Sequence, residues 1–139
     1  MNLNDLYNKA NIEQIDIFNW KMHNSKARII YDEDYTIYMD YSQIKSYTEE
    51  KELLGEELGH YYENAYYTFA STKYEVEIAE YKAMKWKALN LCPLKSILSC
   101  FYDGIYNVYS IAEKLQISVN TVEFAIKYYK DNNLLMINA

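Results

Sequence analysis

The stretch that decides the fold is EKELLGEELGHYYENA, residues 50–65. Its apolar side chains fall on one face at about 100° per residue, which predicts an amphipathic helix. The opposite face carries two adjacent glutamates and one of the two histidines of the chain. Glycines at positions 55 and 59 each cost a helix interior about 1 kcal/mol relative to alanine. We therefore expect a structural reason for them. The residues of the apolar face are Leu54, Leu58, Tyr61, Tyr62 and Ala65.

The polar face of this helix has the spacing of a metal site. Glu56 and His60 lie one turn apart and point the same way, and Glu57 directly follows the first of them. This is the geometry of the His-Glu-x-x-His zinc helix, with Glu56 in the place of the first histidine. A carboxylate oxygen is an acceptable zinc ligand, although oxygen ligands also suit manganese or magnesium. An exposed polar face without a metal is the alternative that these residues leave open.

Gly55 and Gly59 lie between the two faces and are themselves one turn apart. Because glycine has no Cβ, such a pair lets another backbone approach the helix closely. We expect a strand to use this surface and to lie beside the polar residues. This close approach would explain two residues that helix propensity alone disfavours.

The next helix offers a third ligand, which a catalytic zinc usually requires. In YEVEIAEYKAMKWKALNL, residues 74–91, Glu80 shares a stripe with apolar side chains and Lys87. A carboxylate is costly to bury there unless a cation meets it, and that cation is either a metal or a basic side chain such as Arg28. Glu77 lies near the same face of the helix. Spacing alone does not choose between Glu77 and Glu80.

Composition limits the possible functions. The chain has 139 residues, half of them hydrophobic, and a net charge of −6. This charge argues against non-specific binding to nucleic acid or to anionic membranes. Cys92 and Cys100 form no disulfide or metal-binding pattern, and the N-terminus lacks the apolar segment of a signal peptide. No window reaches the length of a membrane span, so we expect a soluble, cytoplasmic protein with reduced thiols.

Hydrophobic periodicity divides the chain into helices and strands. A helical N-terminus precedes three alternating segments that are typical of strands, and the acidic run at 32–34 predicts a hairpin turn between the last two. Two long helices follow, the second ending before Pro93, and then three short helices. The sequence therefore predicts an α+β fold, mainly helical, with a small antiparallel sheet. Its expected parts are a core at 1–93 and a C-terminal helical tail at 94–139 packed on the core.

Two motifs together resemble the ImmA/IrrE family of metallo-endopeptidases. In that family a His-Glu-x-x-His helix is followed by a helix with the pattern Glu-x-x-Ala-x-x-Trp, and Glu80, Ala83 and Trp86 stand at those spacings. The resemblance covers roughly residues 1–130, including the strand before the first motif and the C-terminal helices. It implies a zincin-like core.

The resemblance also implies which residues form the site. His60 matches the second zinc histidine of the family, Glu80 matches its downstream glutamate ligand, and Glu57 matches its general base. Glu56 stands where the first histidine usually is, so the ligands would be Glu56, His60 and Glu80. The implied cofactor is Zn²⁺, with Mn²⁺ or another divalent cation as the alternative because of the second carboxylate.

The implied reaction is hydrolysis of a peptide bond. Glu57 would deprotonate the attacking water, and Tyr61, Tyr62 or another nearby tyrosine would donate a hydrogen bond to the oxyanion. Family members cleave helix-turn-helix repressors of phages or other mobile elements, so the resemblance implies a repressor as the protein substrate. A catalytically inactive member that binds and sequesters a repressor is a second interpretation.

The C-terminal tail supports a third interpretation, a DNA-binding regulator. Residues 108–129 have the pattern of a helix-turn-helix, whose second helix would enter a major groove. From 105 to 139, however, three lysines are balanced by three acidic residues, and phosphate contacts need a positive surface. We therefore do not expect nucleic-acid binding, and we favour a helical cap that covers the core or docks the repressor.

Overall fold

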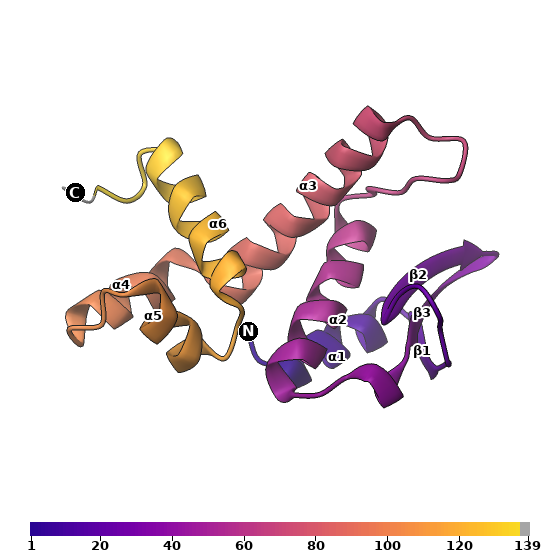
Figure 1. Ribbon diagram of the computed structural model, residues 1–139, viewed down its shortest axis with the longest axis horizontal. Coiled ribbons are helices and arrows are strands. Elements are labelled where there is room, and N and C mark those ends of the chain that lie inside the picture. Colours follow the sequence, from indigo (N-terminus) through magenta and orange to yellow (C-terminus); the bar gives the residue numbers. More distant parts are fainter. Residues whose placement is uncertain (137–139) are drawn as a thin grey trace.

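The structure is a computed structural model, and it describes residues 1–136. The fold is α+β and mainly helical, as predicted. Figure 1 shows the sheet at one end of the molecule, the three C-terminal helices at the other, and α3 running between them. In chain order the elements are α1 (Leu3–Ile12), β1 (Asp16–Asn19), β2 (Ala27–Asp32), β3 (Asp34–Met39), η1 (Tyr41–Gln43), α2 (Tyr47–Tyr62), α3 (Lys73–Leu91), α4 (Leu94–Tyr102), α5 (Val108–Leu115) and α6 (Val119–Asp131).

The sheet is mixed, so the prediction of an antiparallel sheet was wrong for β1. β2 and β3 form the expected hairpin, and Glu33 at its turn has a positive φ of 66°. β1 does not pair with its sequence neighbour β2. It pairs with β3 and runs parallel to it, because the hairpin turns β3 back into the direction of β1. The strand order β1-β3-β2 leaves β2 at an edge of the sheet.

Side-chain caps fix where the two long helices begin. The Ser46 hydroxyl accepts a hydrogen bond from the N–H of Glu49 (3.1 Å) at the start of α2. Thr72 and Glu75 form a reciprocal capping box at the start of α3. Helix α3 ends before Pro93, which confirms that prediction. These starting points set which residues of α2 and α3 face one another.

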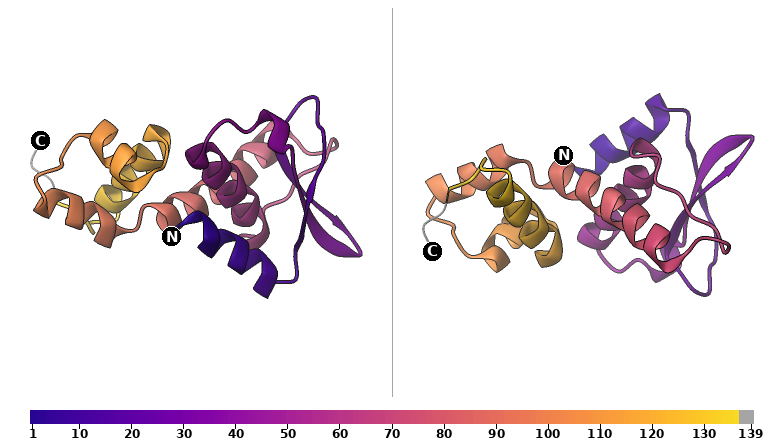
Figure 2. Two further views of the ribbon diagram at one scale, coloured as in Figure 1. Left: turned by 90° about the horizontal axis from the view of Figure 1, so that it is seen from below. Right: turned by 90° about the horizontal axis from the view of Figure 1, so that it is seen from above.

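One continuous hydrophobic cluster runs through the molecule. Leu54 and Leu58 of α2 are completely buried in it, as is Val122 of α6, so the apolar face of α2 is confirmed as part of the core. In both views of Figure 2, α4, α5 and α6 lie together at the end of α3 that is away from the sheet. Within residues 1–136, every helix is too short or too polar to cross a membrane.

The segment between β1 and β2 is held by one buried carboxylate, that of Asp40, which is 2% exposed. Its oxygens accept hydrogen bonds from the backbone N–H groups of Met22 (2.9 Å) and Ser42 (3.1 Å) and from the side-chain amide of Gln43 (2.7 Å). These donors, the Met22 N–H first, hold the pKa of Asp40 well below its usual value. Gln43 also donates to the carbonyl oxygens of Met22 and Ser25. The network therefore holds the loop that leads from β1 into β2.

We expect Asp40→Asn to lower the melting temperature at pH 7, and we expect the deficit to shrink below about pH 4. A carboxyl group whose pKa is lower in the folded state than in the unfolded state, where it is about 3.9, stabilises the fold at pH values above the unfolded-state pKa. The stabilisation is lost as the pH falls toward the folded-state pKa. Thermal unfolding of both proteins between pH 7 and pH 3, followed by circular dichroism, measures the difference. A deficit that stays constant over this range would contradict the role given to the carboxylate.

Candidate metal centre

Three side chains from α2 and α3 converge on one point. Glu56, His60 and Glu80 each offer one ligand atom, and the three atoms lie within 4.8 Å of one another. Nε2 of His60 and Oε1 of Glu80 are 3.5 Å apart. Two ligands at about 2.1 Å from a tetrahedral zinc lie about 3.4 Å apart, so this separation suits a shared ion. The structure thus brings together the three residues singled out from the sequence, and the group could hold a metal ion.

The fold places Glu80, and not Glu77, beside His60. Glu77 lies on an exposed part of α3, where its Oε1 is 4.0 Å from Nζ of Lys73. The side chain of Glu80 is 39% exposed, so the cost of burying its charge argues for a cation less strongly than the sequence suggested. Among the described residues, the ion-pair partner of Glu80 within 4.0 Å is His60 and neither Arg28 nor a lysine. Its convergence with His60 is therefore what makes it a candidate ligand.

His60 is held in a tautomer that can bind a cation. Its ring is buried, and Nδ1 lies 2.7 Å from the carbonyl oxygen of Ala65. Because that oxygen can only accept, Nδ1 carries the proton of the neutral ring, and Nε2 keeps its lone pair toward Glu80. Asn64 has a positive φ of 50°, and the N–H of Ala65 donates to the carbonyl of His60 (2.9 Å). The end of α2 thus folds back and brings the Ala65 carbonyl to the ring.

The glycines of α2 allow α3 to cross it closely. A Cβ at Gly59 would lie 2.5 Å from the carbonyl oxygen of Ala83, and one at Gly55 would lie 3.1 Å from Cγ of Lys87. The expectation that a strand uses this surface was wrong, because the glycine side of α2 faces α3. The close crossing has a consequence for the site: Glu80, one turn before Ala83, reaches His60, the neighbour of Gly59.

Glu57 lies on the side of the site that faces the sheet. Its Oε2 accepts a hydrogen bond from the backbone N–H of Ile29 at 2.8 Å, which joins α2 to the free edge of β2. Burial raises the pKa of Glu57 to about 7, although His60 and the Ile29 N–H oppose this effect. Glu57 and the three candidate ligands line one groove of about 390 Å³. The candidate base and the candidate ligands therefore open to the same space.

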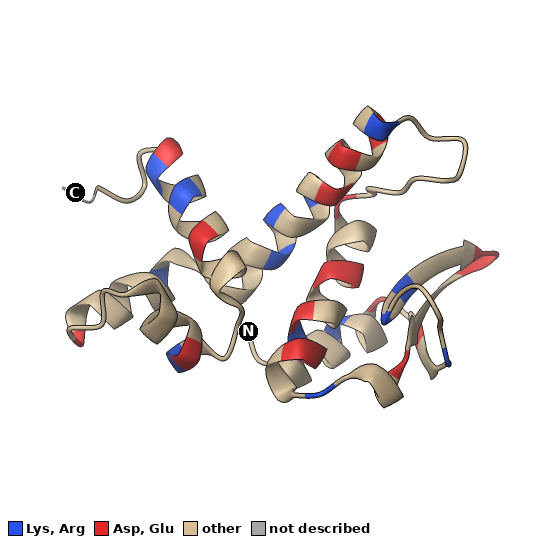
Figure 3. Ribbon diagram, viewed as in Figure 1, with Lys and Arg blue, Asp and Glu red and all other residues tan. Residues whose placement is uncertain are grey.

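The charges around the site favour a cation. Acidic residues gather along α2 and the first half of α3 (Figure 3). Burial raises the pKa of Glu56; Lys87 opposes this increase, and the neighbouring carboxylate of Glu80 adds to it. Two carboxylates that approach so closely are stabilised by a proton or a cation between them. A divalent ion would meet this requirement at neutral pH.

The tyrosines that follow His60 directly do not face the groove. Tyr61 and Tyr62 donate hydrogen bonds to Glu13 (2.8 and 3.3 Å), so of the expected alternatives another nearby tyrosine fits the groove better than these two. Tyr67, in the loop after α2, lines the groove instead. The carboxylate of Glu80 and burial raise the pKa of Tyr67 to about 12, so its hydroxyl stays protonated and can donate. The sequence pattern does not single out Tyr67 among the nearby tyrosines, because the position of Tyr67 depends on how the loop after α2 folds.

The chain was compared with protein families, curated proteins and solved structures. No family model matches the chain, and neither a curated protein nor a solved structure matches it. The convergence of the three side chains and the groove into which they open are therefore the features that bear on function.

Proposed function

We propose that the chain is a metal-dependent endopeptidase of the ImmA/IrrE type. The observation that carries the proposal is the convergence of Glu56, His60 and Glu80 within 4.8 Å. Glu57 lies in the same groove. Three protein ligands with an open fourth position are the pattern of a catalytic zinc. Zn²⁺ is the proposed cation, and Mn²⁺ is the alternative, because two of the three ligands are carboxylates.

The residues of the groove divide the chemistry among them. When bound, the cation supplies a Lewis acid for the peptide carbonyl and the attacking water. Glu57 accepts the proton of that water. Its Oε2 accepts a hydrogen bond from the N–H of Ile29, which leaves Oε1 to accept the proton. The hydroxyl of Tyr67 donates a hydrogen bond to the carbonyl oxygen of the substrate as negative charge develops there.

The free edge of β2 offers a place for the substrate. Residues 25–29, along and just before this strand, line the groove, and β2 is at the edge of the sheet. An extended peptide can pair with such an edge through its main chain. On the resemblance of the two motifs, we propose a helix-turn-helix repressor of a phage or mobile element as the substrate. An exposed, extended segment of that repressor would lie along β2.

DNA binding by the C-terminal helices has less support. In a helix-turn-helix the first residues of the second helix contact the bases. In this chain the start of α6 is turned inward: Thr121 is completely buried, and the Ser118 hydroxyl donates to Glu52 at 2.8 Å. Further along the helix, Lys127 is paired with Asp131 (2.7 Å). These contacts favour a structural role for α6 over insertion into a groove of DNA.

The metal site is tested by two matched variants of α3. We expect Glu80→Gln to weaken zinc binding by at least about 100-fold, because it replaces a ligand and not merely a supporting group. Glu77→Gln makes the same change in charge one turn earlier, away from His60, and is expected to bind zinc as the unmodified chain does. Competition with a chromogenic chelator, after metal is removed with EDTA, measures the three affinities. Equal affinities for all three proteins would overturn the site.

The activity is tested with the zinc-loaded chain. Candidate helix-turn-helix repressors encoded near its gene are incubated with the protein, and mass spectrometry identifies the products. Cleavage at a single segment, which stops when zinc is removed and returns when zinc is added, is the expected result. A chain that binds zinc and a repressor without cleaving it would instead support the inactive, sequestering interpretation.

A further inference from the structure

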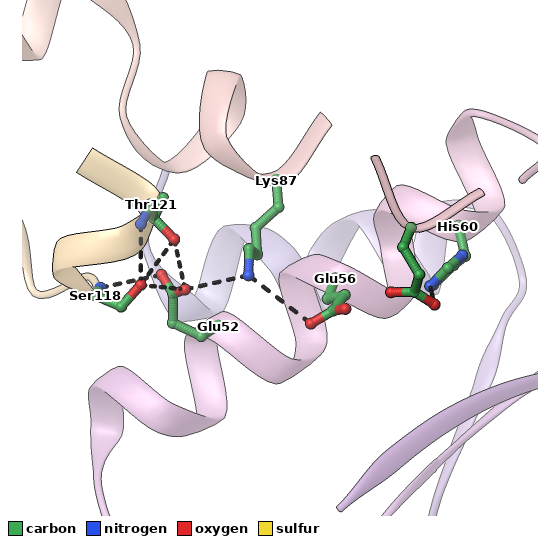
Figure 4. Close-up of polar contacts among 7 residues, drawn as sticks. Glu52, Glu56, His60, Lys87, Ser118 and Thr121 are labelled. Carbon is green, nitrogen blue, oxygen red and sulfur yellow. Dashed lines mark hydrogen bonds and ion pairs between the residues drawn. The ribbon is translucent and has the colours of Figure 1, made fainter. Parts of the chain in front are cut away.

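Lys87 is a buried cation between two carboxylates. It comes from α3, and its side chain is 8% exposed. Its Nζ lies 3.3 Å from Oε1 of Glu52 and 3.8 Å from Oε2 of Glu56, and Figure 4 shows it between them. The missing side chain of Gly55 makes room for its stem, since a Cβ there would lie 3.1 Å from Cγ of Lys87. The ammonium group is thus built into the crossing of α2 and α3.

Glu52 is itself held by the start of α6. Its Oε1 accepts hydrogen bonds from the hydroxyls of Ser118 (2.8 Å) and Thr121 (2.6 Å), and its Oε2 accepts one from the backbone N–H of Ser118 (3.2 Å). Ser118 is the N-cap of α6, and Thr121 is completely buried. A negative charge is also favoured at this end of a helix. The C-terminal helices therefore fix the position of the carboxylate that is nearer to Lys87.

Lys87 and a metal ion would compete for the same carboxylate. Glu56 is a candidate ligand, and the ammonium of Lys87 is its ion-pair partner. The positive charge of Lys87 also repels a dication bound nearby. The contact of Lys87 with Glu52 is the shorter of the two, so Glu52 draws the ammonium away from Glu56. Without the charge on Glu52, Lys87 would pair with Glu56 alone.

We propose that Lys87 is an internal competitor of the metal ion for Glu56, and that Glu52, anchored by α6, limits this competition. The inference rests on the proposed function, because it concerns the same metal site. Through its contacts with Glu52, the first turn of α6 thereby influences the affinity of the site for the metal. Because coupling free energies are reciprocal, metal binding in turn strengthens the contact between Glu52 and Lys87.

The test compares the zinc affinities of the full-length, metal-free proteins at pH 8. Lys87→Met keeps an unbranched stem over Gly55 and removes the charge, so we expect zinc to bind about tenfold more tightly. Glu52→Gln still accepts the N–H of Ser118 but no longer holds the ammonium by charge, so we expect zinc to bind about tenfold more weakly. When Lys87→Met is already present, Glu52→Gln should change the affinity by less than about threefold, because Glu52 acts through Lys87.

Lys85→Met is the matched control. Lys85 also comes from α3 and pairs with Glu63, just after α2, at 3.5 Å. This variant removes the same charge between the same two helices, and we expect it to leave zinc affinity unchanged. If Lys85→Met tightens zinc binding as much as Lys87→Met does, the effect is one of net charge and the inference fails. Circular dichroism establishes that each variant is folded, and Lys87→Gln replaces Lys87→Met if the latter is not.

The outcomes separate this inference from the proposed function. If the unmodified chain binds zinc and Lys87→Met does not bind it more tightly, the inference fails and the metal site stands. If neither protein binds zinc, both fail. If Lys87→Met binds zinc and the unmodified chain does not, the competition is stronger than expected and the inference is supported.

Discussion

Replacing Glu57 with glutamine is expected to remove peptide cleavage and to leave zinc bound. The amide oxygen of glutamine can still accept the hydrogen bond from the N–H of Ile29, so the contact between α2 and β2 is kept. The amide cannot take a proton from water, and a positioned general base contributes about 10²- to 10⁴-fold to a rate. We expect kcat to fall about 10³-fold, with zinc affinity unchanged. Cleavage assays and chelator competition on the same preparation measure both quantities.

The stability of the metal-free protein gives an independent check on Glu57. Burial raises the pKa of this carboxyl to about 7, above an unfolded value of about 4.3. Such a group does not destabilise the fold at pH values below its unfolded-state pKa. As the pH rises from there toward the folded-state pKa, the group lowers the free energy of unfolding by a growing amount. Glu57→Gln should therefore raise the melting temperature at pH 8 and leave it nearly unchanged at pH 4. Undiminished kcat would remove the assignment as base, whereas loss of zinc would point to a structural role.

The elements of the fold are largely encoded by local pattern, and their pairing is not. Alternation over the three strand segments predicted each strand, and the acidic run at 32–34 predicted the hairpin. Alternation says nothing about which strand lies beside which, because every strand offers two edges. The parallel pairing of β1 with β3 is therefore a tertiary result.

The candidate metal site likewise combines residues that local pattern predicts with residues whose roles depend on tertiary packing. Glu56 and His60 were predictable because a single helix fixes residues one turn apart. The choice of Glu80 over Glu77 depends on how α3 crosses α2, which a helical wheel does not contain. Glu52 accepts hydrogen bonds from Ser118, 66 residues away in the chain, so its role depends on how α6 docks. The one local signal of this network was a lysine at position 87 in an otherwise apolar stripe.

The largest effect on stability is expected at Gly59. In an exposed helix interior, replacing glycine with alanine stabilises by about 1 kcal/mol. At Gly59 the new Cβ would lie 2.5 Å from the carbonyl oxygen of Ala83 and 3.1 Å from its Cα. These are backbone atoms, and they cannot move without moving α3. We therefore expect the opposite sign, a loss of about 3 kcal/mol in the free energy of unfolding, and weaker zinc binding because Glu80 is carried away from His60.

Gly55→Ala is the matched control for this prediction, one turn earlier on the same helix. Its new Cβ would meet Cγ of Lys87 at 3.1 Å and Cδ1 of Leu91 at 3.3 Å, and these side-chain atoms can shift. The gain in helix propensity then offsets the crowding, and we expect a change within about 1 kcal/mol. Urea unfolding of the two variants and the unmodified chain measures the contrast. If Gly59→Ala were as stable as Gly55→Ala and kept its zinc, the helices could not cross this closely, and the approach of Glu80 to His60 would lose its physical basis.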